Sequence, residues 1–293
     1  MDRVYLAIFY VFKALVSILP FWVLKRLLYI VADTARFFNK KHRRIIRKNL
    51  DLAFGETMSE EEKKRIIKAC YRNLALNGAD FIKNQNSTKE KILSKVTFVN
   101  EEIMLEAIKT KKPIIAQAAH YGNWELLGLT IAARFGAASV VGRALDSRVM
   151  DKILSKNREQ FDVELIDKKN ALRPMMRALS QRRILGILVD QRAGNDGIEV
   201  EFFGRKTSHI HAASILARKM DALIVPMFIR TDDHKHFIIT FHTPIETPRT
   251  ANMEEDIFLA TQAQASAIEK AIREKPDEWF WFHKRWSDYE SYD

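Results

Sequence analysis

The sequence is poor in the residues and motifs that mark several large enzyme classes. A single cysteine, Cys70, stands in 293 residues, which excludes an internal disulfide and a cysteine-rich metal site and fits a reducing compartment. No G-x-S-x-G, H-E-x-x-H, G-x-G-x-x-G or G-x4-G-K-[ST] pattern occurs, which argues against serine-hydrolase, zinc, dinucleotide and P-loop chemistry. We interpret His209 and His211 as loop or helix-start residues rather than ligands, so we expect no metal and no cofactor.

Long uncharged runs are also absent, although the N-terminus is strongly apolar. Residues 4–32 are apolar with few interruptions, but neither Val4–Phe12 nor Ala14–Leu24 reaches the ~20 residues that cross a bilayer. Lys13 and Pro20 interrupt the stretch. Two interpretations stay open for residues 1–35: one strained membrane span, or a helical hairpin that lies in the membrane interface.

Charge is unevenly distributed along the chain. The net charge is +11, and residues 1–50 carry eleven Lys and Arg against two Asp, a local excess of +9. A basic excess suits nucleic acid, anionic lipid or an acidic protein. Because the charge lies within and just after the most apolar stretch, and no nucleic-acid-binding signature is present, we favour a membrane surface. The cluster at 40–48 predicts a cytoplasmic side.

Strand and helix patterns alternate from Pro113 onward. This alternation predicts an α/β fold in which a mostly parallel sheet is flanked by helices on both faces. No repeat or Gly/Ser-rich linker divides the chain, so we expect residues 36–293 to form a single domain, with a sheet core at about 96–245 and a C-terminal helix and aromatic tail at 253–286. The expected strands are 96–99, 114–119, 139–142, 163–166, 184–189, 198–203, 222–229 and 236–242; the expected helices include 59–84, 124–135, 147–160, 171–182, 210–219 and 253–275.

The segment PIIAQAAHYGNWELLG, residues 113–128, is the most informative stretch. An apolar strand ends at His120, Asn123 is a good N-cap, and a helix can run from Trp124 to Phe135. Glu125 falls in the first helical turn, where the helix dipole favours an anion. Across such a corner the two side chains can converge, so we predict that His120 is a general base oriented by Glu125.

Other polar groups follow strands that would share one rim of a parallel sheet. Arg143 and Asp190 stand at such ends, and Gln191 follows directly. We expect these residues to bind substrate, and we expect the Arg205–Lys206 pair to contact an anionic part of it. The backbone N–H groups of Gly122 and Asn123 are candidate oxyanion donors, although Asn123 is more securely a cap and Gly122 a turn residue.

Several blocks in order carry a resemblance to a known family. HYGNWE resembles the H-x4-D/E signature of the glycerolipid acyltransferase superfamily, and its H-x-G-N-W-E form is similar to the late (secondary) acyltransferases of bacterial lipid A biosynthesis. Further blocks agree in order at 189–191, 200–204, 223–226 and 276–286, so the resemblance covers about 1–286. The Glu-Gly-Thr block of the superfamily is absent, which leaves its phosphate-recognition role unassigned.

The resemblance implies both substrates. The donor would be an acyl-acyl carrier protein such as lauroyl or myristoyl carrier protein, and the acceptor a Kdo-bearing, bis-phosphorylated, tetra-acylated lipid A precursor acylated on a 3-hydroxyacyl chain. The implied location is the inner membrane, with the catalytic domain on the cytoplasmic side. Two alternatives remain open: an acyltransferase of the same fold acting on another glycolipid, such as a phosphatidylinositol mannoside, or on a lysophospholipid; and a noncatalytic basic membrane adapter.

Overall fold

The computed structural model describes residues 2–143 and 147–292. Met1, the first residue of the predicted segment 1–35, and Asp293, the last residue of the predicted domain 36–293, lie outside the described residues. A seven-stranded sheet has the order β1-β9-β8-β2-β5-β3-β4. Every pair in it is parallel except β8 with β9, which confirms the mostly parallel sheet. Its strands are β1 (Val96–Val99), β2 (Ile114–Ala118), β3 (Ala138–Gly142), β4 (Val163–Asp167), β5 (Ile184–Leu188), β8 (Leu223–Thr231) and β9 (Phe237–Phe241).

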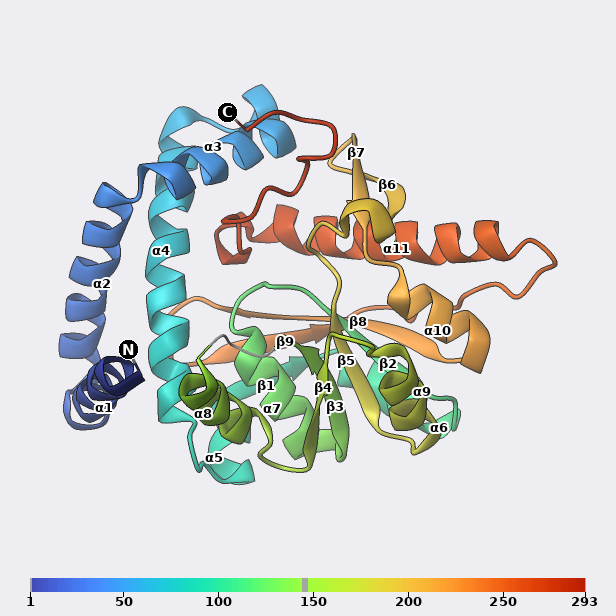
Figure 1. Ribbon diagram of the computed structural model, residues 1–293, viewed down its shortest axis with the longest axis horizontal. Helices are drawn as coiled ribbons and strands as arrows, with labels where there is room; N and C mark the ends of the chain where they lie inside the picture. The colour runs from blue at the N-terminus through green and yellow to red at the C-terminus, as the bar shows by residue number, and fades with distance from the viewer. Residues whose placement is uncertain (1, 144–146, 293) are drawn as a thin grey trace.

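Helices cover both faces of this sheet (Figure 1). Side chains of α9 (Leu172–Ser180), α10 (Ala212–Met220) and α11 (Met253–Glu274) share a core with one face, and those of α6 (Glu101–Lys109) and α7 (Trp124–Phe135) share a core with the other. The remaining helices are α1 (Asp2–Ile18), α2 (Phe21–Phe38), α3 (Lys40–Phe54), α4 (Glu60–Lys83), α5 (Lys89–Leu93) and α8 (Arg148–Arg158).

Strand β2 shows why the two cores separate. Successive side chains of a strand point to opposite faces. Ile115 therefore belongs to the core beneath α10 and α11, whereas Ile114 and Ala116 belong to the core beneath α7. All five residues of β2 are buried, as expected for a central strand covered on both sides.

Helix α4 connects the sheet domain to the N-terminal helices. Ser59 caps it by accepting a hydrogen bond from the N–H of Glu62, and Cys70 is buried in the core. Helices α1 and α2 meet at Pro20, do not lie antiparallel, and both pack against α4, which stands between α2 and the sheet (Figure 1). Within the described residues, no helix combines the length and the hydropathy needed to cross a membrane.

The structure differs from the sequence prediction beside α11. The predicted strand 198–203 is present as β6 (Ile198–Phe202), but it does not join the large sheet. It pairs antiparallel with β7 (Arg205–His209), a strand that the sequence analysis did not predict. Gly204, with φ of +68°, makes the tight turn between them. The sequence of β7, RKTSH, lacks the alternation of apolar and polar residues that predicts a strand.

Candidate functional site

The strand–turn–helix corner after β2 positions His120. The chain leaves β2, turns through Gly122 and enters α7, and the side chain of Asn123 accepts a hydrogen bond from the N–H of Leu126, as a cap should. Gly122 has φ of +57°, and a Cβ there would lie 1.8 Å from the carbonyl oxygen of Ile229. Only glycine fits this turn, which brings the loop tightly against β8.

The hydrogen-bond partner of His120 is Asp190. The Nδ1 atom of His120 lies 2.9 Å from Oδ1 of Asp190, which follows β5. Strands β2 and β5 are parallel neighbours, so their C-terminal ends lie side by side at one edge of the sheet. A carboxylate can only accept, so Nδ1 carries the proton and Nε2 is the nitrogen left to take one. The Asp190 side chain is fully buried, whereas that of His120 is 23% exposed.

This geometry corrects the role expected of Glu125. Glu125 does lie in the first turn of α7, but its carboxylate accepts hydrogen bonds from Arg158 of α8. Nε of Arg158 donates to Oε2 at 2.8 Å, and Nη2 donates to Oε1. The local sequence suggested Glu125 because it is five residues away. Asp190 instead makes the bond from seventy residues away because β5 pairs with β2.

The two charges of the pair shift each other's pKa. Burial alone would raise the pKa of Asp190, but the neighbouring imidazolium of His120 and the hydrogen bonds from His120 and Trp279 hold it well below its ordinary value. Burial opposes protonation of His120, yet the carboxylate of Asp190, with a smaller contribution from Glu125, raises the pKa of His120. The pair is therefore a base whose protonated form the protein stabilises.

A cavity of about 610 Å³ opens beside His120. At the C-terminal ends of the strands it is lined by polar groups, among them His120, Glu125, Arg143, Arg158 and Gln191. The first residues of β3, β4 and β5, namely Ala138, Val163 and Ile184, line it as well, so it runs the length of these five-residue strands, roughly 17 Å. A polar mouth and an apolar bore of this length suit an extended alkyl chain with a reactive head group.

The other predicted site residues divide into two groups. Arg143 and Gln191 line the cavity with His120, as expected of residues on one rim. Arg205 is not among its lining residues in the part of the chain that the structure describes: its guanidinium donates to the carbonyl of Leu52 and to Glu290. Its partner in the prediction, Lys206, forms an ion pair with Glu199. Arg205 and Lys206 therefore do not line the cavity with His120, and their contact with substrate stays a prediction.

The oxyanion candidates are also constrained. The N–H of Gly122 donates to the carbonyl of Glu278 at 2.9 Å, so it is already used in the fold. The buried side chain of Asn123 caps α7 and donates to Asp80, which confirms its structural role. Across residues 2–143 and 147–292, no group of three or more His, Cys, Asp or Glu side chains is placed to hold a metal ion.

Two contacts of the site were missed from the sequence. Arg158 binds Glu125, but it lies at the end of a helix with no motif around it. Trp279 donates from Nε1 to Oδ2 of Asp190 at 2.8 Å, whereas the sequence assigned no site residue to the aromatic tail. The signal that could have found Trp279 is its place in the tail block shared with the family that the sequence resembles.

Known proteins with similar sequences are named as acyltransferases. The mycobacterial relatives include a phosphatidylinositol mannoside acyltransferase of Mycobacterium tuberculosis, 23% identical over 171 residues, which are 57% of this chain and 52% of that protein. The chain thus spans about half the length of these relatives. A lipid A biosynthesis lauroyltransferase of Escherichia coli is 23% identical over 92% of this chain and 87% of its own length.

A lipid A biosynthesis acyltransferase 2 of Shigella flexneri is 21% identical over 84% of this chain and 78% of its own length. The sequence profile of the bacterial lipid A biosynthesis acyltransferases matches residues 2–288, nearly the whole chain. The chain therefore belongs to the bacterial lipid A biosynthesis acyltransferase family.

Proposed function

We propose that the protein is an O-acyltransferase of lipid A or glycolipid biosynthesis that uses His120 as its general base. The observation that carries this proposal is the His120–Asp190 pair at the polar mouth of an apolar cavity. Nε2 of His120 takes the proton of an acceptor hydroxyl while Asp190 stabilises the imidazolium. Glu125 supports the same positive charge through space and holds Arg158 at the mouth.

The alkoxide attacks the carbonyl carbon of a thioester donor directly. The C–S bond then breaks, and the imidazolium returns its proton to the departing thiolate, so that an ester and a free thiol are formed and His120 is neutral again. No covalent acyl-enzyme is needed. The donor's alkyl chain would occupy the bore between the sheet and α7, with its carbonyl beside His120.

The proposed donor is an acyl-acyl carrier protein, which is acidic. Helix α8 lines the cavity through Leu154 and Arg158, and Lys168 lies at the cavity mouth. The exposed cations Arg148, Lys152 and Lys156 follow at helical spacing on the outer face of the same helix. Replacing Lys152 and Lys156 together by Glu should raise KM for acyl carrier protein at least tenfold, with little effect on a small acyl-pantetheine donor. The matched control is Lys109→Glu with Lys111→Glu, an equal reversal on exposed residues around the end of α6; equal effects of the two double variants would contradict this docking surface.

The proposed acceptor is a Kdo-bearing, tetra-acylated lipid A precursor. The lipid A relatives cover most of this chain and support it, and Arg143 at the cavity mouth is suited to a phosphate of such a precursor. The mycobacterial relatives support the alternative, another glycolipid such as a phosphatidylinositol mannoside. A noncatalytic membrane adapter would have no need of a histidine that is hydrogen-bonded to a buried aspartate at a cavity mouth.

We also propose attachment to the cytoplasmic side of the inner membrane through helices α1 and α2. Val16 of α1 and Leu24 and Leu28 of α2 pack on α4. Large apolar side chains remain exposed elsewhere on the two helices: Ile8, Val11, Leu15, Ile18, Trp22, Ile30, Val31, Phe37 and Phe38. Such a surface, followed by the exposed cations Lys40, Lys41 and Arg44 of α3, suits an interface rich in anionic lipid.

The proposed function is tested by His120→Ala in the purified full chain. Turnover should fall by ~10²–10⁴ while the circular dichroism spectrum is retained, because the proton acceptor alone is removed. Mass spectrometry of a lipid A precursor and of a phosphatidylinositol mannoside, each incubated with a panel of acyl carrier protein thioesters, identifies the acceptor and the chain length. Near-normal transfer by a folded His120→Ala protein would end the proposal.

A further inference from the structure

The C-terminal tail is hydrogen-bonded to the turn that carries His120. The N–H of Phe280 donates to the carbonyl of His120 at 2.9 Å, and the carbonyl of Glu278 accepts from Gly122. Between these bonds, Tyr121 and Trp279 form an isolated antiparallel bridge. The tail thus runs as a short antiparallel partner of the catalytic turn, although more than 150 residues separate the two in sequence.

This arrangement brings the indole of Trp279 to the carboxylate of Asp190. Each carboxylate oxygen has its own donor: Oδ1 faces Nδ1 of His120 at 2.9 Å, and Oδ2 accepts from Nε1 of Trp279 at 2.8 Å. Asp190 and Trp279 are each 1% exposed, so water does not compete for these bonds. An indole N–H can only donate, so the contact has one possible polarity.

Other titratable groups lie around Asp190 without fixing its orientation. His209, His283 and Arg285 are close enough to act on it electrostatically. The hydrogen bonds of Arg285, however, go to Thr207, to the Ser208 carbonyl and to His209. Among the described residues, His120 and Trp279 therefore hold the two oxygens of the carboxylate, and Trp279 is the one that fixes Oδ2.

We propose, building on the proposed function, that Trp279 is a positioning residue of the reaction. By holding Oδ2 it turns Oδ1 toward His120, keeps the proton on Nδ1, and so leaves Nε2 free to act as the base. Trp279 thereby contributes to catalysis as well as to the packing of the tail on the domain.

The first test compares Trp279→Phe with Trp281→Phe. Trp281 is an equally buried tryptophan of the same tail, and its Nε1 donates to the carbonyl of Pro276 at 2.7 Å, away from Asp190. Trp279→Phe should lower kcat about 10–100-fold with KM for the donor within about twofold, because a small misorientation of the base costs rate more than binding. It should also move the acid limb of the pH–rate profile to lower pH, since a carboxylate free to turn away stabilises the imidazolium less. Trp281→Phe should change neither; equal effects of the two variants would overturn the proposal.

The second test uses the fact that the Asp190 carboxylate accepts hydrogen bonds from two donors, His120 and Trp279. Asp190→Asn keeps only one acceptor oxygen. With Trp279 present, that oxygen faces the indole, the amide NH₂ faces His120, and the imidazole is forced into the tautomer with its proton on Nε2. Activity should fall at least ~10³-fold, as expected for a wrong tautomer.

Adding Trp279→Phe to Asp190→Asn removes the indole N–H that donates to that oxygen. The amide can then present its oxygen to His120, so the double variant should be at least tenfold more active than Asp190→Asn alone. A double variant that is no more active than Asp190→Asn contradicts the proposal.

If Trp279→Phe does not fold, Trp279→benzothienylalanine retains the bicycle and lacks the N–H, and the same changes in kcat and pH profile are expected of it. Full activity of His120→Ala would defeat the proposed function; a dead His120→Ala enzyme with normal Trp279 variants would defeat only this inference.

Discussion

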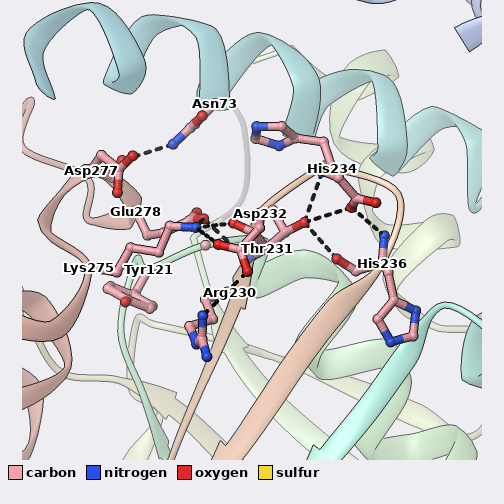
Figure 2. Close-up of polar contacts among 12 residues, drawn as sticks. Asn73, Tyr121, Arg230, Thr231, Asp232, His234, His236, Lys275, Asp277 and Glu278 are labelled. Carbon is pink, nitrogen blue, oxygen red and sulfur yellow. Dashed lines mark hydrogen bonds and ion pairs between the residues drawn. The ribbon is translucent and has the colours of Figure 1, made fainter. Parts of the chain in front are cut away.

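Glu278 allows a direct test of the buried contacts that hold the C-terminal tail. Its side chain is 3% exposed, and Figure 2 shows it beside Lys275 and Thr231, with Asp232 and Asp277 nearby. Oε1 accepts from the N–H of Thr231 at 3.2 Å and lies 3.5 Å from Nζ of Lys275, which also pairs with Asp232. Burial raises the pKa of Glu278 to about 7 despite the attraction of Lys275.

The sign of the pH dependence follows from this raised pKa. The unfolded chain releases the proton near the ordinary value of 4.5, whereas the folded protein retains it to about pH 7. Protonated Glu278 therefore contributes its full share to the free energy of unfolding below pH 4.5, and this contribution is lost as the pH rises through about 7. A shift from 4.5 to about 7 corresponds to a loss of about 3 kcal/mol in the free energy of unfolding at most.

The assay is urea unfolding followed by tryptophan fluorescence at pH 5 and pH 8. Glu278→Gln keeps an acceptor for Thr231 and stays neutral, so the variant should gain stability relative to wild type at pH 8 by about 2–3 kcal/mol and by much less at pH 5. Glu254→Gln, an exposed change in the first turn of α11, controls for the loss of one negative charge. If the free energies of unfolding of wild type and Glu278→Gln differ by the same amount at pH 5 and at pH 8, the reasoning is refuted.

Two further predictions concern the catalytic corner. Gly122→Ala should destabilise the protein by at least about 2 kcal/mol, because the turn needs a positive φ and the added carbon meets a carbonyl oxygen, whereas Gly78→Ala, in open space on α4, should be neutral or stabilising in thermal unfolding. A Gly122→Ala protein with wild-type melting would contradict that geometry. Activity should rise with pH around a midpoint above the ordinary histidine value of 6.5, because Asp190 raises the pKa of His120 and the base must be unprotonated. In kcat/KM profiles Asp190→Asn should shift any residual activity to a lower midpoint, and an unchanged midpoint would refute the assignment.

Several features of this protein follow from short-range signals in its sequence. The corner at 120–124 was predictable because an apolar strand, an N-cap at Asn123 and a helix opening at Trp124 lie within a few residues of one another. The mostly parallel sheet followed from alternating strand and helix patterns, and the meeting of strand ends at one rim placed Arg143 and Gln191 beside His120. In each case the physics acts over one turn of helix or one strand, or through a general rule of α/β sheets.

The choice of partners within the site depends on tertiary structure alone. Glu125 is near His120 in sequence, yet Arg158 binds it; Asp190 is distant in sequence, yet the pairing of β2 with β5 brings it to the imidazole. Trp279 reaches Asp190 only because the tail folds back along the catalytic turn. Local spacing can place a side chain on a strand end or a helix turn, but it cannot state which of several carboxylates an imidazole meets, because crossover connections and the packing of remote segments decide that.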